Sequence, residues 1–584
     1  MSFKEMVAPV DFTFIESGGK EYLFPELKKD VLMDRYIGKG YPCSGMEDFV
    51  CTLAKEYWEQ GTEVLKRLEH SPAFHTTKSK TDEAFTIALY YRNIINGGAQ
   101  RVTAMLADLW ASRKEKDGKA KYKIVLITDE SNPEEEEKEA LLNEKNRQEF
   151  RELLADADID FSRFESKDLP EYTVSAEIER AFLPPYFPSA GENYRSRYQA
   201  WMKIIETYSI DIVVTGMWSN TCTLWDMLSV KGHSSHPAFV LLNHSFLGSP
   251  FLQKNDAALR LMHMYSFCDA VVTLSEMDRA YVESFAGRAR YIPNPIAPKK
   301  ASAEKKSEPD TLLWVGRFSS EKNPADVLKM VKLVSDERPQ VKLYMVGTGK
   351  PKMVAEVLTQ IQELALEDHV ILPGFTMDVE EYYRKASVFI STSLLEGFPT
   401  TTAEAFSYEL PIVEYEMPWL AFSRDQRGII SVPQGDYSKM AEEVCRLLAD
   451  PERILKMGKE GNEKLSEFRQ IDIGIMWDQL FHDIFYTEPR KENADPVLKY
   501  LTEFQQLGKK NVTDYYTQKL ESLQKKNEKL EVKIQRVKQD KADLRARLKK
   551  EKNEKNRLQR ELAEYRKYGP LTKVKRKVKK LIGK

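Results

Sequence analysis

The 584-residue chain lacks several features that would assign it to a well-marked class of proteins. It has only five cysteines, an odd number scattered along the sequence, so no disulfide framework is expected. No apolar run approaches the length of a membrane-spanning helix, and residues 1–14 are too acidic and too interrupted for a signal peptide. The formal net charge of −2 does not demand a polyanionic partner. These absences predict a cytoplasmic protein, and the length allows two or three domains with large cores.

Short motifs for common cofactor and metal sites are absent as well. The sequence has no P-loop and no glycine-rich dinucleotide fingerprint of convincing spacing. His233 and His236 have no acidic or thiol partner at metal-ligand spacing. Asp156, Asp158 and Asp160 alternate like a metal cluster, but they follow a long acidic stretch with no strand to position them. We therefore expect no bound metal ion and no cofactor.

Two carboxylates eight positions apart are the most informative feature that is present. Glu396 and Glu404 flank a glycine-proline turn in the segment 393–405, SLLEGFPTTTAEA. Since Pro399 is tolerated in the first turn of a helix, the segment predicts a strand, a tight loop and a helix beginning at about 400–402. The free N–H groups of such a helix start favour an anionic ligand. Carboxylates beside it are useful only if they accept hydrogen bonds from hydroxyls of the same ligand, and a sugar nucleotide has both groups.

A pair of cations lies upstream of the carboxylates. The segment 312–324, LLWVGRFSSEKNP, predicts an apolar strand, a glycine turn and a second helix start, with Arg317 and Lys322 five residues apart. A unit-charge pair at about 4 Å contributes roughly 4 kcal/mol at an effective dielectric constant of 20. Two such cations can replace a metal ion as the counter-charge of a departing nucleoside diphosphate. The alternative is that both are solvated surface cations, the usual place of Lys and Arg.

Two sets of short β-branched runs alternate with amphipathic stretches, which is the βαβ pattern of parallel sheets. Loops at the carboxyl ends of such strands form a ligand crevice, and both motifs lie on such loops. We therefore predict an α/β protein with two Rossmann-like, doubly wound domains that face a cleft. The predicted strands are 84–91, 122–128, 210–215, 239–243, 270–274 and 291–293 in the first set, and 341–346, 370–372, 387–390, 411–414 and 428–432 in the second.

The first set carries two further candidate site elements. Gly97 and Gly98 follow its first predicted strand, where paired glycines allow close backbone approach at a helix start; an ordinary turn is the alternative. His244 ends the run 239–243, where the carboxyl end of a strand would point into the cleft. A loop histidine with satisfied hydrogen bonds is the alternative there.

With these motifs the chain resembles the retaining GT-B glycosyltransferases of the group 1 (family 4) type, over roughly residues 84–487. The signature of that family is a Glu, seven residues and a second Glu in a strand-loop-helix setting. By resemblance, Arg317 and Lys322 hold the donor diphosphate, Glu404 holds the ribose, and Glu396 and His244 lie at the transferred sugar. The resemblance also places these residues in the donor site: Gly97, Gly98, Gly397, Phe398, Thr400 and Thr401.

The resemblance implies transfer of a sugar from an NDP-sugar, with a UDP-sugar as the favoured donor, without a metal ion. Attack would occur on the front face of the sugar, assisted by the leaving phosphate. A GT-B sugar-nucleotide epimerase is one rival, since it shares the fold and the diphosphate chemistry. A catalytically inactive scaffold is another, and intact Arg317, Lys322, Glu396 and Glu404 argue against it.

Two seven-residue registers near the C-terminus predict a coiled coil over 513–566. Asn527 in the seam favours a parallel homodimer, and a single charged helix is the alternative because Glu551 interrupts the seam. The registers are Leu520, Asn527, Ile534, Lys541, Leu548, Lys555 and Leu562, and Leu523, Leu530, Val537, Leu544, Glu551, Leu558 and Tyr565.

A basic amphipathic tail, 569–584, follows the predicted coiled coil and contains no acidic residue. Its composition predicts binding to an anionic membrane surface, and no nucleic acid is expected because no aromatic residue is interleaved with the cations. A solvated tail is the alternative. Together with the rod, the tail predicts a protein peripheral to the inner face of the plasma membrane, acting on a lipid-linked or polymeric acceptor such as a bacterial cell-wall, teichoic-acid or capsular glycan.

The predicted organisation has seven parts. Residues 46–69 have apolar positions at helical spacing, so the N-terminal extension is expected to be partly helical and to pack on the first domain. The parts are the extension (1–82), the acceptor-side domain (83–298), a linker (299–310), the donor-nucleotide domain with a final helix (311–487), a second linker (488–512), the coiled coil (513–566) and the tail (569–584).

Overall fold

The computed structural model describes two α/β bodies and a few short pieces outside them. Apart from single positions, the described residues are 45–68, 84–130, 171–185, 194–217, 220–247, 264–296, 307–487 and 554–559, with isolated residues elsewhere and the backbone of three short N-terminal strands. Most of the predicted linkers (299–310 and 488–512), coiled coil (513–566) and tail (569–584) lies outside the described residues. Residues 554–559, within the predicted coiled coil, are helical.

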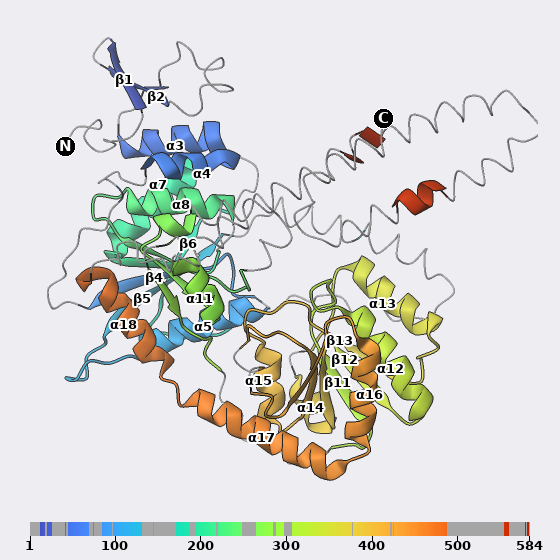
Figure 1. Ribbon diagram of the computed structural model, residues 1–584. Helices are drawn as coiled ribbons and strands as arrows, with labels where there is room; N and C mark the ends of the chain where they lie inside the picture. The colour runs from blue at the N-terminus through green and yellow to red at the C-terminus, as the bar shows by residue number, and fades with distance from the viewer. Residues whose placement is uncertain are drawn as a thin grey trace, which may run out of the picture.

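The first body is built around a sheet that includes β4, β5 and β6 (Figure 1). This sheet has seven strands in the order β10-β9-β8-β7-β4-β5-β6. Every pair of neighbouring strands in it is parallel. The winding direction reverses between β4 and β7, so their carboxyl ends border the crevice where doubly wound sheets bind ligands. The strands are β4 (Phe85–Tyr90), β5 (Tyr122–Asp129), β6 (Glu179–Leu183), β7 (Ile212–Thr215), β8 (Ala238–Leu242), β9 (Ala270–Thr273) and β10 (Ala289–Tyr291).

The second body has a six-stranded parallel sheet with the order β13-β12-β11-β14-β15-β16. Its winding reverses between β11 and β14, the strands that precede the cation pair and the first glutamate. The prediction of two doubly wound domains is confirmed. The strands are β11 (Thr311–Val315), β12 (Lys342–Val346), β13 (Val370–Gly374), β14 (Val388–Ser391), β15 (Ile412–Tyr415) and β16 (Ile429–Val432).

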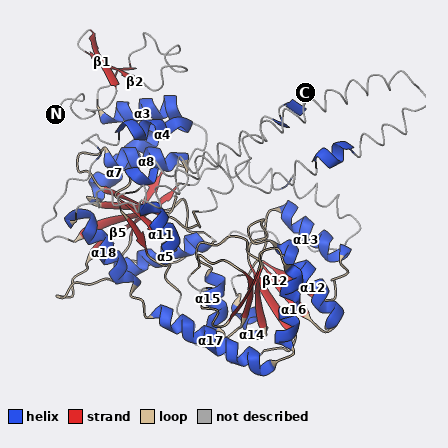
Figure 2. Ribbon diagram, viewed as in Figure 1, coloured by secondary structure: helices blue, strands red, loops and turns tan. Residues whose placement is uncertain are grey.

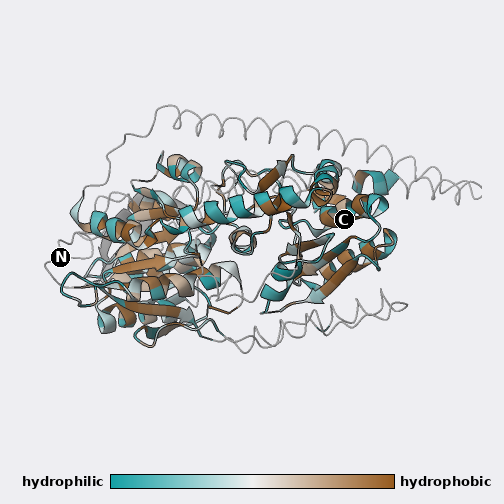
Figure 3. Cartoon of the chain, turned by 90° about the horizontal axis from the view of Figure 1, so that it is seen from below, coloured by the Kyte–Doolittle hydropathy of each residue, from teal (hydrophilic) through white to brown (hydrophobic). Residues whose placement is uncertain are grey.

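Helices cover both faces of each sheet (Figure 2), and the apolar strands lie between them with hydrophilic helix faces outward (Figure 3). In the first body, α3, α4, α7, α8 and α11 share one core with the sheet, and α5 and α18 share the other. In the second, α12, α13 and α16 cover one face, and α14, α15 and part of α17 cover the other. Burying apolar side chains on both faces is what allows a parallel sheet to be stable.

Most of these helices were predicted only as amphipathic stretches between strands, and the structure defines their limits. They are α3 (Met46–Tyr57), α4 (Gly61–Leu68), α5 (Gly98–Ala111), α7 (Tyr194–Tyr208), α8 (Thr221–Lys231), α11 (Glu276–Glu283), α12 (Pro324–Glu337), α13 (Pro351–Glu363), α14 (Glu380–Lys385), α15 (Thr400–Ser407), α16 (Tyr437–Leu448), α17 (Pro451–Arg469) and α18 (Ile473–Tyr486). Within the described ranges, no helix has the length and apolar composition that spanning a bilayer requires.

The N-terminal extension combines a small sheet with helices. Strands β1 (Phe12–Ser17), β2 (Lys20–Pro25) and β3 (Tyr41–Pro42) form an antiparallel sheet, and the short 3-10 helix η1 (Trp58–Gln60) joins α3 to α4. Trp58 stacks on Trp225 of α8 with ring centroids 6.3 Å apart and accepts the indole N–H of Trp225 at its carbonyl oxygen. The helical part of the extension therefore packs on the first domain, as the apolar spacing predicts.

Helix α18 lies where the sequence did not predict it. The sequence places it in the second domain with 311–487, but Trp477 and Phe481 pack edge-on against Trp110 of α5, at 4.8 and 5.3 Å between ring centroids. Asp478 also accepts hydrogen bonds from Tyr122 and Arg113, both at 2.7 Å. The chain crosses back to the first domain between α17 and α18 (Figure 1), because the apolar face of α18 completes the first core.

Strand β6 is absent from the predicted strands. It is an edge strand that follows the long acidic stretch, and it begins with the charged residues Glu179 and Arg180. Phe182 on its outer side is exposed. An edge strand needs only one apolar side, so it lacks the continuous apolar run by which the central strands were recognised.

Candidate active site

The loop after β11 presents Arg317 because the neighbouring strand end comes very close to it. Gly347, after β12, has φ +145°, and a Cβ atom there would lie 2.0 Å from the carbonyl oxygen of Gly316. The N–H of Phe318 then donates to the carbonyl oxygen of Thr348 at 2.8 Å. These contacts determine where the chain turns, and they leave the side chain of Arg317 exposed beyond the carboxyl end of the strand.

Lys322 and Glu396 form an ion pair between two adjacent loops of the second domain. The loop that follows β14 lies against the loop that follows β11. Leu394 N–H donates to the carbonyl oxygen of Glu321 at 2.8 Å, and the Thr392 hydroxyl donates to that of Asn323 at 2.9 Å. Both charged side chains are mostly buried. The structure thus brings the first glutamate and the second cation of the two motifs to one position at the point where the sheet reverses direction.

Helix α15 begins at Thr400, directly after the glycine-proline turn, as predicted. Gly397 and Thr401 lie at this helix start, which has no side-chain cap at Pro399. Phe398 points into the second domain, where its ring lies 5.7 Å from that of Phe468 in α17. Its side chain is therefore part of the packing of the second domain.

Glu404 accepts hydrogen bonds from two residues that sequence reasoning missed. The hydroxyl of buried Tyr383, on α14, donates to Oε2 at 2.9 Å. Nη1 of Arg101, on α5 of the first domain, donates to Oε1 at 2.6 Å. Arg101 lies one helical turn after Gly98. A cation in this position, on the helix that follows the glycine pair, is the one sequence feature that could have indicated its role. Tyr383 has no comparable sequence signal, because its position depends on how α14 packs against α15.

The glycine pair lies at the N-terminus of α5, as predicted. Gly97 is the N-cap with φ +141°, and its N–H donates to the Tyr172 hydroxyl at 3.5 Å. Gly98 is the first residue of the helix, and a Cβ atom there would meet no described atom within 4 Å. The helix start therefore has space free of described atoms beside Gly98, one turn before Arg101.

His244 follows β8 and faces the crevice from the first domain. Its ring lies 5.9 Å from that of Tyr91 in an edge-to-face arrangement. A Cβ atom on Gly216 would lie 2.6 Å from its Nε2, so the glycine after β7 makes room for the ring. Burial lowers the pKa of His244 to about 4. The imidazole is therefore neutral near pH 7 and can exchange a hydrogen bond with a ligand without carrying charge; within the described residues, its buried Nε2 has no hydrogen-bond partner.

Residues from the two domains meet directly at the site. A Cβ atom on Gly397 would lie 2.6 Å from the carbonyl oxygen of His244, so only glycine fits this approach. The positive charge of Arg317 also lies near enough to Tyr91 to lower its pKa, opposing the larger rise caused by burial. The structure therefore brings Gly397 next to His244, and Arg317 near Tyr91, across the boundary between the two domains.

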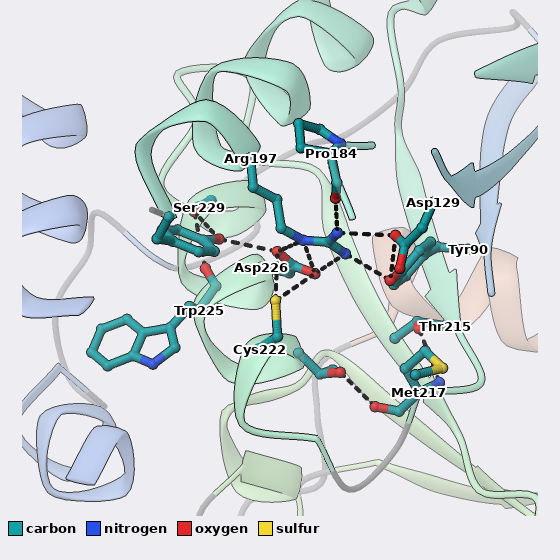
Figure 4. A network of polar contacts seen from close by, with 12 residues as sticks. Tyr90, Asp129, Pro184, Arg197, Thr215, Met217, Cys222, Trp225, Asp226 and Ser229 are labelled. Atoms are coloured by element: carbon teal, nitrogen blue, oxygen red, sulfur yellow. Dashed lines mark hydrogen bonds and ion pairs between the residues drawn. The ribbon is translucent and has the colours of Figure 1, made fainter. Parts of the chain in front are cut away.

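A buried polar cluster lies at the carboxyl ends of β4 and β5 (Figure 4). The Arg197 guanidinium, only 2% exposed, donates to both carboxylate oxygens of Asp226, at 2.9 and 2.8 Å. It also donates to Asp129 at 2.9 Å and to the Tyr90 hydroxyl at 2.6 Å. Burial raises the pKa of Asp129, and the Arg197 charge opposes that rise. The cluster ties two strand ends to α7 and α8, directly beside Tyr91.

Most of the second domain matches a known protein family. Residues 296–464 match the family described as glycosyl transferases, group 1. These residues form a group 1 glycosyltransferase domain. The domain contains Arg317, Lys322, Glu396 and Glu404, whereas the glycine pair and His244 lie before the matched range. Among the described residues, no group of three His, Cys, Asp or Glu side chains is arranged to hold a metal ion.

The chain is also similar to individual proteins. An exopolysaccharide phosphotransferase of Streptomyces coelicolor is 27% identical over 241 residues, 39% of this chain and 25% of that protein. A poly(glycerol-phosphate) alpha-glucosyltransferase of Bacillus subtilis is 25% identical over 239 residues, 39% of this chain and 35% of that protein. The matched residues thus span only 25% and 35% of the length of these two relatives.

A solved structure shows the fold. That of Anabaena HepE in complex with UDP-glucose matches with a TM-score of 0.50 and 14% sequence identity, covering 68% of this chain and 99% of that chain. The group 1 domain and the domain before it together have the GT-B fold of two α/β domains with parallel sheets.

Proposed function

We propose that the protein transfers a sugar from an NDP-sugar, with a UDP-sugar as donor, to a glycan or lipid-linked acceptor, with retention at the anomeric carbon. The observation that carries the proposal is the pairing of Lys322 with Glu396 on adjacent loops of the group 1 domain, facing His244 of the other domain. Cation, carboxylate and neutral imidazole match a ligand that has a diphosphate next to a sugar ring.

The diphosphate is the part of the donor whose charge changes during the reaction. When the bond between the anomeric carbon and the β-phosphate oxygen breaks, negative charge develops on the leaving nucleoside diphosphate. Lys322, exposed Arg317 and the N–H groups at the start of α15 would stabilise that charge, and preorganised donors of this kind are usually the largest single contribution to catalysis. The acceptor oxygen then bonds to the anomeric carbon on the same face, and its proton passes to a leaving phosphate oxygen.

The carboxylates would bind hydroxyls. Glu396 is held by Lys322 beside the leaving group, so its free lone pairs can accept hydrogen bonds from the donor sugar. Glu404 accepts a hydrogen bond from Tyr383, and we propose that its carboxylate binds the ribose, whose hydroxyls would compete with Arg101 for it. His244 would bind a sugar hydroxyl as a neutral group, because burial lowers its pKa to about 4.

The proposed acceptor class is inferred from the relatives, and the proposed place at the membrane from the basic tail. The names of the similar proteins refer to a poly(glycerol phosphate) and to an exopolysaccharide. We therefore propose a polymeric acceptor of the bacterial cell surface, elongated at the inner face of the plasma membrane.

A panel of UDP-, GDP- and ADP-sugars tests the proposal. We expect one UDP-sugar to raise the melting temperature and to be hydrolysed slowly, and to be consumed faster when glycan or lipid-linked acceptors are added. NMR of the product at the anomeric carbon should show the configuration of the donor. Accumulation of an epimerised UDP-sugar without acceptor would show an epimerase instead. If no donor binds or turns over, the proposed function is wrong and an inactive scaffold becomes the better interpretation.

Binding of the basic tail to membranes can be tested separately. The tail carries several Lys and Arg residues with apolar positions between them, and each cation near an anionic surface contributes about 1 kcal/mol. The full chain is expected to sediment with vesicles rich in phosphatidylglycerol, and to lose most of this binding when 571–584 are deleted. Neutral vesicles and high salt should abolish it in both proteins. Equal binding of the full and shortened chains to anionic vesicles would refute a role for the tail.

A further inference from the structure

One aromatic pair joins the two domains beside the site and is not accounted for by donor binding. Phe246 of the first domain and Trp419 of the second stack with ring centroids 4.1 Å apart and an interplanar angle of 8°. Phe246 is buried, and Trp419 is half-buried. The two residues lie 173 positions apart in the sequence, so only contact between the domains brings them together.

Trp419 makes a second contact that reaches the donor site. Its indole N–H donates to the backbone carbonyl oxygen of Glu396 at 2.9 Å. The carboxylate of the same glutamate pairs with Lys322. Glu396 is therefore held at its side chain by its own domain, and at its backbone by a residue that stacks on the other domain.

On the opposite side, Phe246 lies two residues after His244. The backbone of His244 is the surface that Gly397 approaches, since a Cβ atom on this glycine would lie 2.6 Å from the carbonyl oxygen of His244. The short segments that carry His244 and Glu396 thus touch twice, once through this backbone approach and once through the aromatic rings. Moving the rings apart would move both site residues.

The loop that carries Trp419 packs against its own domain through residues on both sides of Trp419 in the sequence. Met417 and Leu420 are buried. Further along, the Ser423 hydroxyl donates to the fully buried carboxylate of Glu414, and buried Lys464 of α17 pairs with Asp425 at 2.6 Å. The second domain therefore holds Trp419 in place independently of Phe246. Because Trp419 also stacks on Phe246, a shift of one domain would displace the site residues of the other.

We propose that Phe246 and Trp419 are positioning residues that bring Glu396 and His244 to the same donor sugar when the two domains close. The inference rests on the proposed function, because it assigns these residues a part in the same transfer reaction. Donor binding by Arg317 and Lys322 depends on the pair less than turnover does, since both cations lie on the loop after β11 and not on the segments that carry the rings. The pair should therefore affect turnover much more than nucleotide affinity.

Four variants separate the two contacts. Trp419→Phe keeps a ring for stacking and loses the N–H donor, whereas Trp419→Ala loses both, and Phe246→Ala loses the stacking only. Phe485→Leu is the matched control, because Phe485 stacks on Phe85 at 4.9 Å within the first-domain packing, away from the crevice. We expect kcat to fall by about 10- to 100-fold in Phe246→Ala and Trp419→Ala, since small misplacements of reacting groups have effects of this size. Trp419→Phe should lose about fivefold, as expected for one hydrogen bond.

The UDP dissociation constant of each variant should stay within about threefold of wild type, and the double variant Phe246→Ala/Trp419→Ala should lose less than the product of the two single losses. If Phe246→Ala and Trp419→Ala turn over donor as fast as Phe485→Leu, the inference is overturned while the proposed function stands. If wild type turns over no donor, the proposed function fails instead.

Amide hydrogen exchange provides a readout that needs no turnover. Removing Trp419 should increase exchange at residues 244–247 of the other domain, whereas Phe485→Leu should leave them as protected as in wild type. Unchanged protection of 244–247 in Trp419→Ala would refute the coupling between the domains. A general loss of protection in both domains would show a folding defect and would equally count against a positioning role.

Discussion

Replacing Lys322 by alanine is expected to lower kcat for donor turnover by about 10²- to 10³-fold, the loss typical for removal of one preorganised group that stabilises transition-state charge. Two effects act in the same direction. The substitution removes a cation from the leaving diphosphate, and it leaves the mostly buried carboxylate of Glu396 without its partner. That unpaired negative charge would repel the charge that develops on the phosphate. Steady-state kinetics with the donor identified by the panel would measure the loss.

Lys332→Ala is the matched control for this experiment. Lys332 is a partly exposed cation on α12 that pairs with Asp336 one turn further along the same helix. Exposed pairs of this kind contribute little, so this variant should keep the wild-type kcat. A Lys322→Ala enzyme within threefold of wild type would show that the diphosphate is neutralised elsewhere, and the site assignment would have to be abandoned.

Replacing Arg197 by leucine is expected to destabilise the first domain by about 3–5 kcal/mol, the range found when one partner of a buried ion pair is removed. The guanidinium is 2% exposed and is shared by two carboxylates, Asp129 and Asp226, whose side chains are 5% and 2% exposed. Without it, two buried carboxylates remain near each other and must be protonated or solvated. Chemical denaturation followed by tryptophan fluorescence should show an earlier transition for the first domain.

Arg195 on the same helix serves as the comparison. It pairs with Glu47 and Asp48 of α3, but its side chain is 49% exposed. Arg195→Leu should therefore cost less than about 1 kcal/mol. If both variants were equally stable, the cluster around Arg197 would be a replaceable polar contact and not a support for the strand ends beside the glycine loop.

The predicted strands of the central sheets agree closely with the structure because each is buried on both faces. Apolar, β-branched runs such as 341–346 and 411–414 follow from that burial, and glycine or proline marks their ends. Strand β6 was missed for the complementary reason: as an edge strand it carries charge and an exposed Phe182. Helix α18 was assigned to the wrong domain, because an amphipathic helix shows that it has an apolar face but not which sheet that face will cover.

In the candidate site as well, features set by neighbouring residues were predictable, whereas contacts between distant residues were not. The glycine-proline turn, the helix start at Thr400 and the loop after β11 are local features, and backbone preferences at glycine and proline made them predictable. Arg101 and Tyr383 were not predictable as partners of Glu404, since they lie 303 and 21 residues from it and reach it through packing. The depressed pKa of His244 also required knowledge of its burial.

The sequence by itself therefore determined the fold class, the two doubly wound sheets and the carboxylate and cation motifs at their strand ends. It could do so because hydrophobic periodicity and turn chemistry act over a few residues. Only the tertiary structure decided that Lys322 pairs with Glu396, that Arg101 reaches Glu404 across the crevice, and that Trp419 stacks on Phe246. Those contacts depend on which faces of distant elements pack together, and no local pattern in the chain encodes that choice.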